Sequence, residues 1–163
     1  MESAGTGDTD VSVITVGSAV TVGDFVRRLF ELRFRSAAED ILRYGHYRGW
    51  LEDQDERHPE APLNRQTAAR IIHQFLQIEC YIPDLQDITP ATRLKDLYTC
   101  RVCANHIAQV YTRGIMNAQE FVTDDHNTVL LFNHLAPVST TEAETIYQKI
   151  TEVFQLLNLS LNS

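Results

Sequence analysis

Apolar residues recur along most of the chain at the three- and four-residue spacing of a helix that buries one face. The first such stretch begins near Asp24, which can cap it, and its apolar positions are Phe25, Val26, Leu29 and Phe30. A second helix is predicted over about 36–44 and ends at Gly45, a residue suited to the left-handed terminal position. A third helix is predicted over about 65–78, with Asn64 as its cap.

The second half of the chain repeats this order after a linker over 81–95 that contains two prolines. A helix is predicted over about 97–112, ending at Gly114. The loop that follows holds a predicted short strand at Thr128–Phe132, and residues 13–22 alternate weakly, which indicates another short extended piece. Together these elements predict a mostly α fold with loops of unusual length.

The last helix is predicted over about 140–157 and has the clearest start signal. Ser139 or Thr140 caps it, and Glu142 stands three residues after Ser139, as a capping box requires. In such a box the serine hydroxyl accepts a bond from a first-turn N–H, and the glutamate carboxylate accepts one from the N–H of the cap. The sequence therefore predicts a reciprocally capped helix start.

One segment of the sequence occurs twice, at residues 57–72 and 132–147. The matched positions are Ala61-Pro62 with Ala136-Pro137, Leu63 with Val138, Asn64 with Ser139, and Ala68 with Ala143. Upstream, Ala38, Ile41 and Gly45 have the same intervals as Ile107, Val110 and Gly114. Because a helix–loop–helix unit must bury its apolar face on a neighbour, the repeat predicts units that stack on one another.

Each copy carries further signals in a fixed order. The first has Gly45-His46-Tyr47-Arg48-Gly49-Trp50, Pro59, Pro62, Leu63, Asn64, Arg65 and Ala68. The second has Asp87-Ile88, Phe132, Pro137, Val138, Ser139, Glu142 and Ala143, and Val20-Thr21-Val22-Gly23-Asp24-Phe25 is a partial copy. This order resembles the S-layer homology (SLH) module of bacterial cell-surface proteins. The pattern of that module is an apolar helix ending near Gly-x-x-x-Gly, then Phe-x-Pro-x-x-Pro-Ile-Thr-Arg-Ala-Glu opening a second helix.

The resemblance implies a fold and its boundaries. It implies a pseudo-threefold bundle in which three motif helices, starting at Asp24, Arg65 and Thr140, pack centrally. We expect a disordered leader at 1–12, followed by a single domain over 13–163. That domain would hold a partial repeat at 13–35 and two full repeats, at 36–80 and 87–157.

The resemblance also implies a function, because SLH modules commonly hold proteins to the cell surface by binding anionic wall polysaccharide between repeats. An arginine at a helix start adds fixed donors to the positive helix end, which suits a sugar carboxylate. On this basis the expected ligand-binding residues are Arg65, Asn64, Trp50, Tyr47 and Glu142. The expected location is extracellular, at the bacterial cell surface, although no export signal is visible in residues 1–20.

The chain departs from the motif where the ligand chemistry is concentrated. Arg65 is the only motif arginine, since Val22 and Thr140 occupy the equivalent places, and the first full copy has Thr67 in place of the glutamate. The net charge of −8 also disfavours an anionic polymer. The alternative is therefore a divergent SLH-like scaffold that contacts another surface protein and binds no glycan. The sequence does not predict an oligomeric state.

Composition and motifs narrow the remaining function classes. A chain of 163 residues with 44% apolar residues is typical of one globular domain. The negative charge argues against nucleic acid, and no apolar run has the length of a membrane-spanning helix. No nucleophile elbow, phosphate-binding glycine loop or zincin motif is present, so we expect no enzyme and no cofactor. Residues 124–127 form an expected polar turn and not a cation loop.

Three cysteines, Cys80, Cys100 and Cys103, leave several possibilities open. An exported protein could join Cys80 to Cys100 or to Cys103, and otherwise the thiols stay free and buried. The string Cys100-x-x-Cys103-x-x-His106 also allows a metal site, which would belong to an intracellular helical protein. Structural zinc normally needs four ligands, and the helical spacing points His106 aside from the two cysteines, so no metal site is predicted.

Overall fold

The computed structural model describes residues 20–34 and 40–158, so the leader predicted at 1–12 and most of the extended piece at 13–22 lie outside the described residues. The elements are α2 (Val22–Arg33), α3 (Ile41–Arg48), α4 (Asp53–Arg57), α5 (Arg65–Gln74), α6 (Ala104–Thr112), α7 (Thr140–Leu156), β2 (Gln119–Val122) and β3 (Thr128–Leu131). The prediction of a mostly α fold is confirmed.

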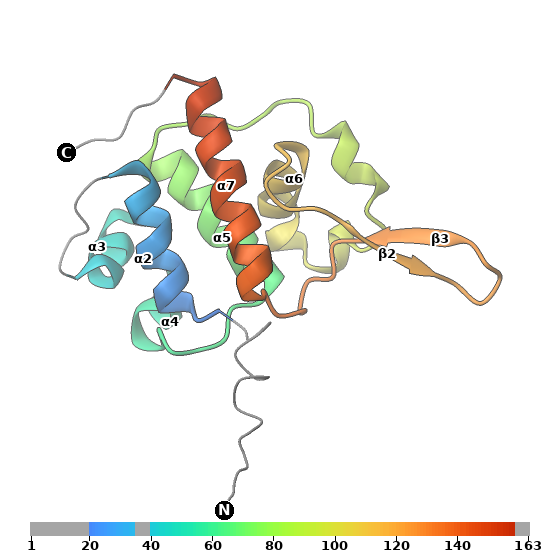
Figure 1. Ribbon diagram of the computed structural model, residues 1–163, viewed down its shortest axis with the longest axis horizontal. Helices are drawn as coiled ribbons and strands as arrows, with labels where there is room; N and C mark the ends of the chain where they lie inside the picture. Colours follow the sequence, from blue (N-terminus) through green and yellow to red (C-terminus); the bar gives the residue numbers. More distant parts are fainter. Residues whose placement is uncertain (1–19, 35–39, 159–163) are drawn as a thin grey trace, which may run out of the picture.

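The helices form one packed body from which a hairpin projects (Figure 1). Helix α2 packs against α3, α4 and α7, and α5 packs against α6. Strands β2 and β3 pair antiparallel, with Gln119 opposite Leu131, and extend away from the helices (Figure 1). The largest fully buried side chains are Trp50, Phe25, Phe75, Phe132, Leu29, Leu63, Ile71, Ile72, Ile107, Ile115, Met116 and Ile146.

Helices α2, α5 and α7 begin with the same local structure. Their first residues are Val22, Arg65 and Thr140, and each is preceded by a polar cap: Thr21, Asn64 and Ser139. Each cap side chain accepts a hydrogen bond from the backbone N–H three residues later, at 2.8–3.2 Å. The caps predicted at Asn64 and Ser139 are confirmed. The cap predicted at Asp24 is wrong, because Thr21 takes that place and Asp24 lies in the first turn.

The residues just before these caps are joined in a closed ring of backbone hydrogen bonds. The N–H of Val20 donates to the carbonyl of Val138 at 3.0 Å, that of Val138 to Leu63 at 2.9 Å, and that of Leu63 to Val20 at 2.7 Å. All three side chains are buried. The ring therefore fixes the starts of α2, α5 and α7 to one another at one end of the helices.

The glycine that ends α3 is not the one predicted from the sequence. Gly45 lies inside the helix, where an added Cβ would come within 2.6 Å of Leu51. The left-handed end is Gly49, at φ +97°, and Gly114 has the matching role after α6, at φ +79°. The amides of Trp50 and Leu51 bond to the carbonyl of Gly45, as those of Ile115 and Met116 bond to that of Val110. The repeat upstream of each motif is thus offset by four residues from the predicted register.

Three further elements differ from the prediction in extent. The helix expected over 65–78 ends as an α-helix at Gln74 and continues as a π-helical turn, Phe75–Glu79. Of the helix expected over 97–112, only α6 is α-helical, and Leu97–Thr99 and Arg101–Cys103 are short 3₁₀ turns. The strand predicted at Thr128–Phe132 is confirmed as β3, whereas its partner β2 was not predicted.

Candidate functional site

Arg65, the leading candidate for ligand binding, is buried inside the protein and retains only 2% of its exposure. Its Nε donates to the carbonyl of Phe132 at 2.7 Å, and its two Nη atoms bond to Glu142 and to the carbonyl of Asn117. The guanidinium lies 4.6 Å from the centre of the Phe132 ring. Burial lowers the pKa of Arg65 to about 10. Each nitrogen of the guanidinium group therefore has a protein partner, which leaves none of them free to bond to a ligand in this structure.

Glu142 and Asn64 are engaged in the same junction. The carboxylate of Glu142 pairs with Arg65 and not with the backbone N–H of its own cap, so only half of the predicted capping box forms. The side-chain oxygen of Asn64 accepts from the N–H of Thr67 at 2.8 Å. Both residues lie beside Arg65, where the Asn64 side chain caps α5 and the Glu142 carboxylate pairs with the Arg65 guanidinium.

Trp50 and Tyr47 lie elsewhere, at the end of α3. Trp50 is fully buried, its indole N–H donates to Glu79 Oε1 at 3.0 Å, and its ring meets the edge of Phe75 at 4.9 Å between centroids. Trp50 is therefore part of the core and has no exposed surface that could contact a ligand. It follows the left-handed Gly49 and occupies the same place as the buried Ile115 in the other repeat. Tyr47 is 88% exposed.

A groove of about 410 Å³ lies between two of the three helices that meet at the ring. We call it the α2–α7 groove, and it is lined by Val20, Asp24, Arg27, Arg28, Glu31, Thr140, Ala143, Glu144 and Tyr147. The guanidinium of Arg28 lies 4.6 Å from the centre of the Tyr147 ring and donates to Glu144 Oε2 at 3.1 Å. Arg27 faces Asp24 at 3.8 Å, and both arginine side chains remain about half exposed, at 53% and 46%.

The charges of the α2–α7 groove are mixed. Three carboxylates, of Asp24, Glu31 and Glu144, accompany two guanidinium groups. Burial raises the pKa of Tyr147 to about 12, so its hydroxyl stays protonated at neutral pH. Fixed donors and acceptors therefore alternate beside an aromatic ring. Such a surface can bind a hydroxyl-rich molecule, and it gives no net attraction to an anion.

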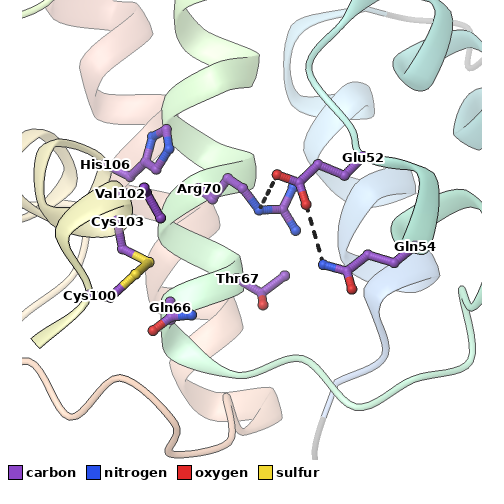
Figure 2. A pocket seen from close by; sticks show the side chains of 9 residues that line it. All are labelled: Glu52, Gln54, Gln66, Thr67, Arg70, Cys100, Val102, Cys103 and His106. Atoms are coloured by element: carbon purple, nitrogen blue, oxygen red, sulfur yellow. Dashed lines mark hydrogen bonds and ion pairs between the residues drawn. A yellow bond between two sulfur atoms is a disulfide. The ribbon is translucent and has the colours of Figure 1, made fainter.

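A second pocket, of about 250 Å³, lies between α4, α5 and the start of α6 (Figure 2). We call it the disulfide pocket, because Cys100 and Cys103 are joined in a disulfide at its edge. Its lining residues are Glu52, Gln54, Gln66, Thr67, Arg70, Cys100, Val102, Cys103 and His106. Cys80 is free and buried, and burial raises its pKa to about 12. The predicted alternatives that paired Cys80 with another cysteine are therefore wrong.

Two chains of polar side chains border the disulfide pocket, one buried and one partly buried. Arg70 forms a two-pronged pair with Asp55, at 2.8 and 2.9 Å. On α6, the Nδ1 of His106 lies 2.8 Å from the Nδ1 of His73, whose Nε2 lies 2.7 Å from Asp84 Oδ1. A carboxylate only accepts, so the Nε2 of His73 donates to Asp84. In the contact between the two rings, one Nδ1 donates its proton and the other accepts it.

The surroundings of this histidine pair shift two pKa values. Burial, helped by His73 and Arg70, lowers the pKa of His106 to about 4, so its ring is neutral at neutral pH. Burial tends to raise the pKa of Asp84, but the hydrogen bonds from His73 and Asn105 outweigh it and hold that pKa below the usual value. Within residues 20–34 and 40–158, no three His, Cys, Asp or Glu side chains are placed to hold a metal ion.

Compared with protein-family models, with curated proteins and with solved structures, the chain finds no match. The resemblance to SLH modules therefore depends on the residues of this chain alone. Among the described residues, no helix combines the length and apolar character needed to cross a membrane.

The α2–α7 groove was not predicted from the sequence, although two signals for it are present. Arg27 and Arg28 form the largest basic cluster in the chain. Tyr147 stands where the other copy of the repeat has Ile72, so it adds a hydroxyl at a position that would otherwise be purely apolar. The disulfide pocket carries the predicted Cys-x-x-Cys string, but as a disulfide and not as a set of metal ligands.

Proposed function

We propose that this chain is a non-enzymatic surface module of the SLH type, which attaches to bacterial cell-wall polysaccharide through the α2–α7 groove. The observation that carries the proposal is the closed ring of hydrogen bonds among Val20, Leu63 and Val138. Export to the cell surface is part of the proposal, and a disulfide is more readily kept in an oxidising compartment.

The ring supports an SLH-like pseudo-threefold arrangement because its three members are equivalent positions of one motif. Each stands two residues before a helix, and the residues that start the helices are the ones aligned with the motif arginine: Val22, Arg65 and Thr140. Three copies of a unit packed around one axis produce a cyclic bond pattern in which each copy donates to one neighbour and accepts from the other. The grooves between such copies are where the family resemblance places the ligand.

The chemistry of the α2–α7 groove favours a polysaccharide stretch rich in hydroxyl groups over a densely anionic one. Its carboxylates accept from sugar hydroxyls, its guanidinium groups donate to them, and the Arg28–Tyr147 stack provides a flat surface for an apolar sugar face. Three carboxylates against two cations would repel a polymer of high negative charge. We therefore keep wall polysaccharide as the partner, but we place its binding site at Arg28 and not at Arg65.

The proposal can be tested by co-sedimentation of the purified chain with bacterial wall sacculi. A double variant that carries both Arg27→Ala and Arg28→Ala should reduce the bound fraction about tenfold. This factor corresponds to roughly 1.4 kcal/mol of lost binding free energy. Arg43→Ala is a matched control, because Arg43 on α3 is exposed and faces Asp40 at 3.8 Å, as Arg27 faces Asp24. Equal retention of the groove variant and the control variant would contradict the proposal.

A second candidate function is assembly with another surface protein, and the β2–β3 hairpin favours it. The hairpin projects from the helical body (Figure 1), and it exposes 41% of Phe121 and 71% of Val122. Exposed apolar groups on a two-stranded hairpin are a suitable surface for strand addition. Light scattering of the chain and of Val122→Lys tests the case in which the other surface protein is a second copy of this chain. A monomer at every concentration, unaffected by the substitution, would count against that assembly through the hairpin.

A further inference from the structure

The Cys100–Cys103 disulfide is poorly placed to stabilise the fold. It closes a loop within a single turn at the start of α6, and it joins no second element. The entropy that a disulfide removes from the unfolded chain grows with the length of the closed loop, so a link between residues three apart removes little. Stabilisation of the fold therefore does not explain why this disulfide is present.

Helix α6 is held in place by other contacts. The side chain of Gln109 accepts from the N–H of Leu85 at 2.8 Å and donates to the carbonyl of the same residue at 3.0 Å. The His73–His106 contact joins α6 to α5. Because these anchors do not include either sulfur, the disulfide can open while the helix keeps its position.

The two sulfurs have unequal surroundings. Cys100 is half-buried and precedes the three-residue turn before α6, whereas Cys103 is 8% exposed and is the cap residue of α6 itself. Both cysteines stand at a helix cap, so the helix ends do not distinguish them, but burial disfavours the charged form of a thiol and Cys103 is the more buried of the two. When the bond is broken, a thiolate at Cys100 is therefore more stable than a thiolate at Cys103.

The disulfide pocket gives an incoming chain room to reach Cys100. Its volume of about 250 Å³ is bordered by the side chains of Gln54, Gln66 and Thr67, and by Val102, which is 85% exposed (Figure 2). Amide and hydroxyl groups can bond to the backbone of a bound peptide, and the apolar Val102 can contact its side chains. Cys80, by contrast, is buried and apart from this pocket.

We propose that Cys100–Cys103 is a redox-active pair that oxidises a dithiol in a peptide or protein substrate. A substrate thiolate attacks the sulfur of Cys100, the Cys100–Cys103 bond breaks, and the electron pair goes to Cys103. The second substrate thiolate then attacks the substrate sulfur of the mixed disulfide, and Cys100 leaves. The substrate gains a disulfide, Cys100 and Cys103 become thiols, and the two protons of the substrate thiols pass to them through solvent. The reaction is stoichiometric.

The first experiment equilibrates the native full chain with mixtures of reduced and oxidised glutathione, then blocks free thiols with N-ethylmaleimide and measures the mass. Excess reduced glutathione should add two labels, and oxidised glutathione should remove them. Cys80 serves as an internal control, because it should be labelled only after denaturation. Circular dichroism should show the same helix content in both redox states. A disulfide that resists excess reduced glutathione until the chain is unfolded would overturn the proposal.

The second experiment assigns the roles of the two sulfurs with single variants. Cys103→Ser leaves Cys100 free and should form a mixed disulfide with oxidised glutathione at least about tenfold faster than Cys100→Ser, whose remaining thiol is buried. Wild type should convert one equivalent of a reduced two-cysteine peptide to its disulfide, and neither variant should. Equal rates for the two variants, or no peptide oxidation by wild type, would contradict the proposal.

This inference is independent of the proposed attachment to the cell wall. The disulfide pocket lies between α4, α5 and α6, whereas the attachment site lies between α2 and α7. Retention on sacculi should therefore be equal for the oxidised and the reduced chain. Loss of retention in the Arg27 and Arg28 variant, with unchanged disulfide exchange, separates the two sites.

Discussion

Two junctions of this protein use the same three groups in different surroundings. At the α5–α7 junction, Arg65 lies 4.6 Å from the Phe132 ring and pairs with Glu142. At the α2–α7 junction, Arg28 lies 4.6 Å from the Tyr147 ring and pairs with Glu144. The arginine side chain is 3% exposed in the first junction and 46% exposed in the second.

The difference teaches that burial, and not residue type, separates a structural arginine from one available to a ligand. Arg65 also donates to two backbone carbonyls, which fix the end of β3 and the loop at Asn117 to the start of α5. Within the described part of the chain, Arg28 contacts Glu144 and the Tyr147 ring, and both of these residues also line the α2–α7 groove. The first junction is closed and the second is open.

The largest expected effect is on stability at the closed junction. Arg65→Ala leaves Glu142 and two carbonyls without their donor, so the free energy of unfolding should fall by about 3 kcal/mol or more. Arg28→Ala removes a half-exposed pair and should change it by about 1 kcal/mol or less. Urea denaturation followed by circular dichroism measures both. Similar losses for the two variants would show that the junctions do not differ in the way their burial indicates.

A smaller effect is expected from neutralising the glutamates. Glu142→Gln keeps the shape of the side chain but removes the carboxylate that is paired with the buried Arg65, leaving the weaker electrostatic influence of Asp96, and should cost about 1–3 kcal/mol of unfolding free energy. Glu144→Gln should cost a few tenths of a kcal/mol at most, because its partner remains hydrated. Thermal melts of the two variants in the same buffer give the comparison. A larger loss for Glu144→Gln would reverse the assignment of closed and open junctions.

A third contact, between α5 and α6, extends the comparison to the dependence of stability on pH. Burial lowers the pKa of His106 from 6.5 to about 4, so the unfolded chain takes up this proton at a higher pH than the folded one. The contribution of His106 to stability is thus complete above pH 6.5 and is lost as the pH falls towards 4.

His106→Asn should therefore flatten the dependence of unfolding free energy on pH between 6.5 and 4. The pKa of Asp84 is lowered from 3.8, so this residue changes the unfolding free energy only at a more acidic pH. The slope in that range is the internal reference for the variant. Unfolding midpoints in urea at several pH values test the prediction. An unchanged slope in the variant would mean that His106 does not titrate as its burial requires.

The sequence predicted those features that depend on local interactions. Asn64 and Ser139 were identified as caps because a cap side chain bonds to an N–H only three residues away. Leu63 and Val138, which the sequence alignment of the two copies pairs, are neighbours in the ring. The strand at Thr128–Phe132 was predicted from its run of β-branched and apolar residues.

The features that were missed depend on contacts between distant segments. Gly45 and Gly49 are equally good terminators in sequence, and the close approach of Leu51 to Gly45 decides between them. The burial of Arg65 depends on Phe132 and Glu142, which the local sequence does not reveal. The Cys100–Cys103 bond was missed because a continuous helix was expected there, whereas 3₁₀ turns interrupt it.

The ring formed by Val20, Leu63 and Val138 has a consequence for biosynthesis. The ring joins the chain segments that precede α2, α5 and α7. It can therefore close only after the segment before α7 has been synthesised. Contacts between segments so remote along the chain form slowly, because a long loop must be ordered first. The part of the chain that contains α2 and α5 therefore stays without its final packing until the segment before α7 has been synthesised.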